Sequence, residues 1–79
     1  MAKAKQKSPA EIIRQLAKEG FGRVYEDYSG RNMYGETCLG IDTSDPDTLI
    51  EEAAFRGVRG AVKDNLGKGY IVYWPSIKG

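Results

Sequence analysis

Apolar side chains in two stretches of the chain recur every three or four residues, which is the spacing of an amphipathic helix. The first stretch runs from Ser8 to Gly20 and the second from Asp45 to Gly57. Each begins with a capping residue followed by proline and ends at a glycine suited to the left-handed conformation. Glu11 completes a capping box with Ser8. We therefore predict two helices, with the apolar stripes Ile12, Ile13, Leu16 and Ala17 in the first and Leu49, Ile50, Ala53 and Ala54 in the second.

Each predicted helix is followed by two segments rich in Tyr, Val and Ile, separated by a turn that contains glycine. This pattern is typical of a β-hairpin. The first hairpin has strands over residues 21–28 and 33–42, and the second has strands over 58–65 and 70–74. The predicted order is αββαββ. It gives an α+β fold, a two-layer sandwich in which a four-stranded antiparallel sheet carries both helices on one face.

The two halves of the chain resemble each other as tandem α-β-β units. Residues 8–30 moved forward by 37 positions lie on residues 45–67, and most identical pairs are Pro, Gly or Asp. Beyond the paired glycines the offset becomes 36, which aligns Tyr34 with Tyr70. Because Pro, Gly and Asp mark element boundaries for physical reasons, two unrelated units of equal layout would match as well. A duplication and a chance similarity both remain open.

The domain organisation follows from these units. We expect a disordered basic tail over residues 1–7 and one α+β domain over 8–79, made of the half-units 8–43 and 45–79. A right-handed connection between the halves leaves the strand orders 2-1-3-4 and 1-2-4-3. We prefer 1-2-4-3, because residues 70–74 form the most apolar strand and the charged strand before it suits a sheet edge.

Strand alternation predicts an uncovered aromatic face. If Phe21 and Val58 point toward the helices, alternation places Tyr25 and Val62 on the same side. The offset of 36 then directs Tyr73 inward, so that the residues on either side of Tyr73 point outward. A contiguous aromatic patch on a small domain usually marks an interaction site. A register slip of one residue would instead bury these side chains. The predicted partner-binding residues are Tyr34, Tyr70, Val72, Trp74, Arg59 and Lys63.

Both hairpin turns place a cation directly after a glycine. Backbone N–H groups in such a turn can form an anion-binding nest, which an adjacent cation reinforces. The candidate anion-binding tips are Gly30 with Arg31 and Gly67 with Lys68. Neither loop has the spacing of a phosphate-binding loop, and a glycine beside a cation is also ordinary hairpin composition.

Charge and composition narrow the function. The net charge is +1, but Lys3, Lys5 and Lys7 lie in the tail, so the rest of the chain has a charge of −2. There is no histidine, and the single cysteine, Cys38, has no evident activating partner. We therefore expect no enzyme activity, no cofactor and no metal site. The lone cysteine, the lack of a long apolar run and the lack of a secretory signal predict a cytoplasmic protein outside the membrane.

The function that the sequence favours is a small non-catalytic module that binds another protein, as an inhibitor or adaptor, through the aromatic sheet face. One alternative is single-stranded nucleic-acid binding on the same face, since Tyr and Trp can stack on bases. The charge of −2 weighs against it. A second alternative is a homodimeric structural domain.

Overall fold

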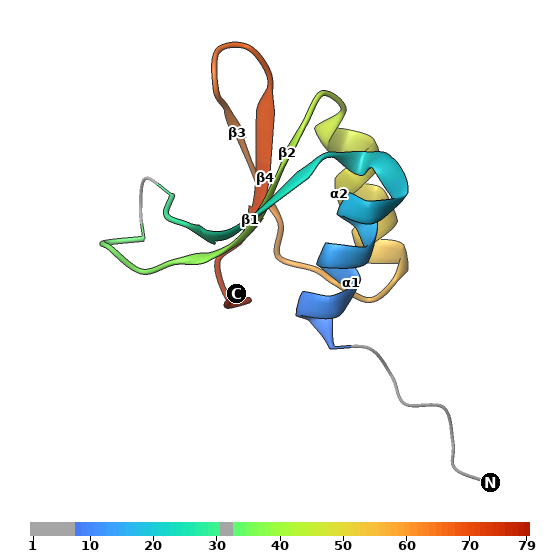
Figure 1. Cartoon of the computed structure of the whole chain (residues 1–79), viewed down its shortest axis with the longest axis horizontal. Helices are drawn as coiled ribbons and strands as arrows, with labels where there is room; N and C mark the ends of the chain where they lie inside the picture. Colours follow the sequence, from blue (N-terminus) through green and yellow to red (C-terminus); the bar gives the residue numbers. More distant parts are fainter. Residues whose placement is uncertain (1–7, 31–32) are drawn as a thin grey trace, which may run out of the picture.

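A computed structural model of the chain describes residues 8–30 and 33–79 (Figure 1). The predicted tail, residues 1–7, lies outside the described residues. The elements in chain order are α1 (Pro9–Leu16), a π-type turn η1 (Ala17–Phe21), β1 (Arg23–Tyr28), β2 (Cys38–Thr43), α2 (Pro46–Phe55), β3 (Val62–Asn65) and β4 (Tyr70–Trp74).

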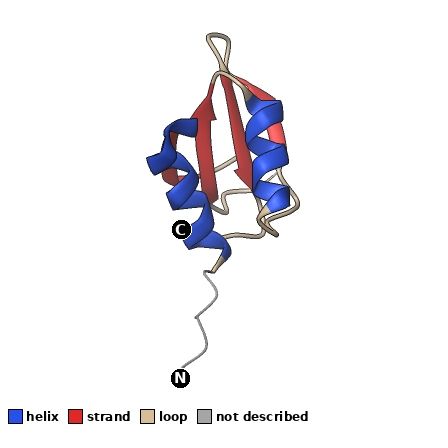
Figure 2. Cartoon of the chain, turned by 90° about the vertical axis from the view of Figure 1, so that its right-hand side faces the viewer, coloured by secondary structure: helices blue, strands red, loops and turns tan. Residues whose placement is uncertain are grey.

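The four strands form one antiparallel sheet in the order β1-β2-β4-β3. Both helices cover the same face of this sheet, and Figure 2 shows them side by side in front of the strands. The predicted α+β class, the two-layer arrangement and the preferred strand order are therefore confirmed. The sheet surface that faces away from the helices is called the open face below.

The helix ends have the predicted local chemistry. The Ser8 hydroxyl accepts a hydrogen bond from the Glu11 N–H at 3.2 Å, and the Glu11 carboxylate accepts one from the Ser8 N–H at 2.9 Å. Asp45 caps α2 by accepting from the Thr48 N–H at 3.3 Å. Gly20, with φ of 104°, supplies the left-handed conformation in which the first helical segment ends.

The main core lies between the helices and the sheet. The helices and the central strands each contribute four of its buried side chains, and Trp74 is the largest fully buried side chain. Burial of this apolar surface is the main stabilising contribution to the fold. The buried members of the cluster are Ile13, Leu16, Leu39, Ile41, Leu49, Ala53, Val58, Val72 and Trp74.

The prediction that Val72 and Trp74 lie on the outer face is therefore wrong, and strand register explains why. Tyr25 lies opposite Gly40 in the first hairpin, and Val62 lies opposite Tyr73 in the second. Positions 25 and 62 are 37 apart, whereas 40 and 73 are 33 apart, so the second strands of the two halves correspond at an offset of 33. The difference from 36 is an odd number, which reverses the facing of every side chain in β4.

The cause of the shorter offset is the unequal length of the two hairpin connections. Residues 29–37 join β1 to β2, whereas residues 66–69 join β3 to β4. The strand predicted over residues 33–42 begins only at Cys38, because the residues before it belong to the connection. Insertions in surface connections cost little stability, so the fold tolerates this difference.

Ion pairs at the periphery of the core join the two helical segments to each other and the first helix to the sheet. Arg56, at the end of α2, donates to Glu19 in η1 at 2.6 Å and to Glu52 in its own helix at 3.0 Å. These two carboxylates raise the pKa of Arg56. Arg14 in α1 makes a two-pronged contact with Glu26 in β1, with both N···O distances at 2.8 Å.

The Arg14–Glu26 pair leads to a prediction about pH. The hydrogen bond from Arg14 lowers the pKa of Glu26 below its usual value. The pair therefore stabilises the fold fully above the pKa of Glu26 in the unfolded chain, and this contribution is lost as the pH falls through the lower pKa of the folded state. We expect Arg14→Ala to return the Glu26 pKa to its ordinary range, measured by an NMR titration of the carboxyl carbon. Arg59→Ala should leave that pKa unchanged, and equal Glu26 pKa values in the wild type and Arg14→Ala would contradict the pairing.

Candidate functional site

The open face is built from two rows of side chains that the strand register places next to each other. One row crosses the sheet through Tyr25, Gly40, Tyr73 and Val62. The next row consists of Arg23, Asp42, Ile71 and Asp64. Gly40 has no side chain, and Ile71 and Tyr73 close over its position. The middle of the open face is therefore apolar and its ends are exposed.

An irregularity in β1 brings a second tyrosine to this face. The register shifts between Tyr25 and Tyr28, so that Tyr28 lies opposite Cys38. Residues three apart point to opposite sides of a regular strand, but a bulge adds one residue and restores the same side. The ring of Tyr28 consequently packs against that of Tyr73, with centroids 5.0 Å apart and planes inclined by 45°.

The β1–β2 connection covers the part of the open face that holds Tyr73 and Cys38. Gly30 lies against the ring of Tyr73, where a Cβ atom would be only 2.7 Å from the ring. Met33 contacts Cys38, with the two sulfur atoms 3.7 Å apart. Burial under this connection raises the pKa of the Cys38 thiol, so the cysteine is a packing residue with little thiolate character at neutral pH.

A hollow lies between the two hairpin connections, and we call it the hairpin hollow. Its volume is about 340 Å³. Figure 1 shows the β1–β2 hairpin projecting away from the helices and the β3–β4 hairpin projecting upward. The lining residues are Tyr25, Asp27, Tyr28, Ser29, Leu66 and Ile71. Tyr25 is 36% exposed and Leu66 48%, and Val62, in the same row as Tyr25, is 38% exposed.

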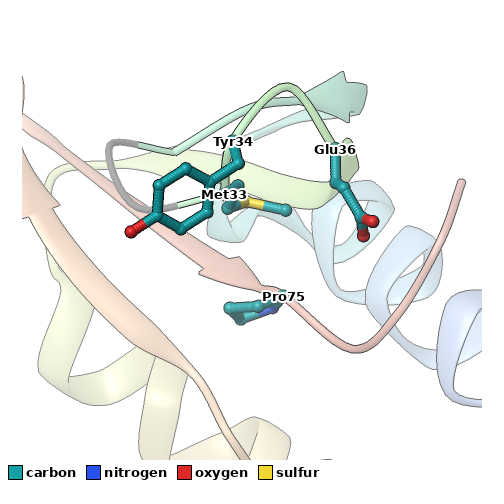
Figure 3. Close-up of a pocket in the computed structure, with 4 residues that line it drawn as sticks. All are labelled: Met33, Tyr34, Glu36 and Pro75. Carbon is teal, nitrogen blue, oxygen red and sulfur yellow. The ribbon is translucent and has the colours of Figure 1, made fainter.

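A second hollow lies beside the β1–β2 connection (Figure 3). Met33, Tyr34, Glu36 and Pro75 line it. Tyr34 is 93% exposed and has a φ of 53°, a left-handed backbone that is uncommon for a residue other than glycine. Figure 3 shows its ring extending beside Met33 and away from Glu36.

The structure does not bring the six predicted partner-binding residues together. Tyr34 is exposed on the β1–β2 connection, and Arg59 is exposed in the connection between α2 and β3. Tyr70 is half-buried, in the register row of the helix-facing Thr43. Lys63 points to the helix side, where it pairs with Asp47 at 3.3 Å. Val72 and Trp74 are in the core.

The predicted anion-binding tips differ in what the structure describes. At the second tip, the Gly67 N–H donates to the Asn65 side chain at 2.7 Å and the Leu66 N–H donates to the Gly69 carbonyl at 2.8 Å. These two donors are therefore engaged within the turn, and Lys68 stays a prediction. At the first tip, the Gly30 N–H donates to the Met33 sulfur, while Arg31 lies outside the described residues.

Sequence reasoning missed the residues that do line the open face. Tyr25, Val62 and Tyr73 were expected under the helices, and Leu66 was expected only as a turn residue. The pattern that could have found Tyr73 is the alternative alignment at an offset of 33, which places Leu39 on Val72 and Ile41 on Trp74. That alignment matches large apolar residues at alternate positions, as a shared core face requires.

Comparisons with known proteins gave no match, whether to a protein family, a curated protein or a solved structure. Within residues 8–30 and 33–79, no group of three or more His, Cys, Asp or Glu side chains is arranged to hold a metal ion. In the same residues, no helix is both long enough and apolar enough to cross a membrane.

Proposed function

We propose that this protein is a small non-catalytic module that binds another protein through the part of the open face that holds the hairpin hollow. The observation that supports this proposal is the pair of exposed apolar side chains that line the hollow, Tyr25 and Leu66. Exposed apolar groups that gather at a concave surface are typical of interaction sites. Aromatic side chains in such places supply much of the binding energy.

The walls of the hollow are also held in place before any partner arrives. Tyr28 packs on Tyr73, and Ile71 at the floor is almost fully buried. Strand pairing fixes the backbone on both sides of Ile71. A preorganised surface loses little conformational entropy on binding, which favours affinity from a small contact area.

The charges on the open face favour a protein partner over single-stranded nucleic acid. The tyrosines could stack on bases, but phosphates need several cations nearby. Arg23 is the one basic side chain in the two described rows of the face, and Asp42 and Asp64 stand in the same row.

We further propose a cytoplasmic location, because the lone buried thiol of Cys38 suits a reducing compartment.

The test is a capture experiment followed by titration of the purified partner. The immobilised protein is exposed to lysate of its native cell, the captured protein is identified and purified, and its affinity is measured by isothermal titration calorimetry. We expect Tyr25→Ala with Leu66→Ala to weaken binding by about tenfold or more, as truncation of interface anchors does. Phe55→Ala is the matched control, since Phe55 is 86% exposed at the end of α2 in the helix layer.

Two outcomes would contradict the proposal. One is a partner whose affinity falls equally with Phe55→Ala, because binding would then not depend on the open face. The other is a dimer, measured by light scattering, that the Tyr25 and Leu66 substitutions convert to a monomer. In that case the face would serve self-association.

A further inference from the structure

One carboxylate lines the hairpin hollow, and two more lie on strands next to it. Asp27 is one of its lining residues. Asp42 and Asp64 lie on the two strands beside β4, each directly opposite Ile71, which forms the floor of the hollow. Arg23 shares their row. Among the described residues, the two rows and the lining of the hollow together contain three acidic side chains and one basic side chain.

These three carboxylates differ from most others in the described chain, because they take no part in its ion pairs. The five ion pairs within residues 8–30 and 33–79 use Glu19, Glu26, Glu36, Asp47 and Glu52. The only described hydrogen bond to any of the three is from the Asn65 N–H to Asp64, at 2.9 Å. An excess of unpaired acidic side chains beside a concave apolar surface gives that surface a negative potential, which attracts cations.

The walls of the hollow suit a long cationic side chain. The faces of tyrosine rings such as Tyr25 attract the head group of Arg or Lys. The methylene stem of such a side chain packs on apolar surface, which Leu66 and Ile71 provide. A carboxylate such as Asp27 forms short, charge-assisted hydrogen bonds with a guanidinium or ammonium group. A hollow of about 340 Å³ lies at the lower end of ligand-pocket volumes, about 300–1,000 Å³, and so suits one side chain.

From this arrangement, and resting on the proposed function, we infer that the partner presents an arginine- or lysine-rich segment. One cationic side chain of that segment occupies the hairpin hollow between Tyr25, Tyr28 and Asp27. Neighbouring cations of the segment lie near Asp42 and Asp64. Charge complementarity therefore selects a basic protein segment and repels nucleic acids and acidic surfaces.

The test uses octaarginine as the probe and the full chain, titrated by isothermal titration calorimetry at low ionic strength. We expect the wild type to bind octaarginine. The double variant Asp27→Asn with Asp64→Asn should bind it more weakly, by about tenfold or more. The matched control is Asp47→Asn with Glu51→Gln, which changes the net charge equally on α2. We expect this control to change the affinity by no more than about twofold, the effect of net charge alone.

Three results would overturn the inference. The first is no binding of octaarginine by the wild type. The second is equal weakening in the two double variants, which would mean unspecific attraction. The third is binding that becomes about tenfold stronger when Lys3, Lys5 and Lys7 are changed to Gln, since the chain's own N-terminal segment would then be the occupant.

The inference can fail while the proposed function stands. A captured protein partner could depend on Tyr25 and Leu66 and still be indifferent to Asp27→Asn with Asp64→Asn. That result would retain the binding face and reject a basic segment as its ligand. Loss of dependence on Tyr25 and Leu66 would instead reject the face itself.

Discussion

Trp74→Ala is expected to lower the free energy of unfolding by about 3–5 kcal/mol, the usual cost of truncating a large buried side chain. The indole is fully buried among Ile13, Leu39 and the other members of the helix-side core. A domain of this size has a total stability of about 5–15 kcal/mol and belongs at the low end of that range. The variant should therefore be largely unfolded or close to it. Urea denaturation followed by circular dichroism measures the change.

A second substitution at the same position separates packing from hydrogen bonding. The indole N–H of Trp74 has no hydrogen-bond partner within the described residues. A buried donor without a partner costs about 1–3 kcal/mol, so Trp74→Phe removes this cost together with part of the packing. We expect Trp74→Phe to lose less than about 1.5 kcal/mol. A loss as large as that of Trp74→Ala would contradict this account, and Phe55→Ala should leave stability within about 0.5 kcal/mol.

Gly22→Ala is expected to cost at least about 3 kcal/mol, because it combines backbone strain with a steric clash. Gly22 joins η1 to β1 with φ of 155° and ψ of −163°, a region that only glycine occupies readily. A Cβ atom there would overlap the carbonyl oxygen of Asp42 and lie 2.8 Å from the Ile41 side chain. Asp42 is the register partner of Arg23, so the substitution disturbs the first pair of the β1–β2 ladder.

Gly67→Ala is the matched control for Gly22→Ala. Gly67 also has a positive φ, of 91°, but a Cβ atom there would meet no other atom within 4 Å. We expect only the left-handed backbone cost of about 1–2 kcal/mol. Urea denaturation of both variants gives the comparison. Equal losses in the two variants would show that the contact between Gly22 and Asp42 contributes nothing beyond backbone strain.

Local chemistry made the elements and their order predictable. The capping box at Ser8, the prolines at positions 9 and 46, and the glycine stops at Gly20 and Gly57 act over a few residues, and each has the expected geometry. The strand order followed from chirality and from the apolar character of residues 70–74. These features depend on short stretches of sequence, so they can be predicted without knowing how the strands pair.

The facing of β4 was not predictable in the same way, since it depends on where β2 starts. The repeat pattern assigned Tyr34 the place of Tyr70, but the residues before Cys38 belong to the connection. No short-range signal marks that boundary, and an error of an odd number of residues exchanges core and surface. The bulge between Tyr25 and Tyr28 was also not predictable from local sequence, because it arises from pairing with β2 and not from β1 alone.

The acidic character of the open face was also hidden in the sequence. Asp27, Asp42 and Asp64 are far apart along the chain, and the near-neutral net charge gives no sign of them. Only strand pairing brings Asp42 and Asp64 to either side of Ile71.

Trp74 is the only tryptophan of the chain, and its position under the helices makes it an optical reporter of the fold alone. An indole in an apolar core emits at shorter wavelength than one in water, and the sheet separates this indole from the open face. Fluorescence emission should therefore change when a variant unfolds and stay constant when a ligand occupies the hairpin hollow. A variant that no longer binds but keeps the blue-shifted emission has lost contacts at the surface and retained its core.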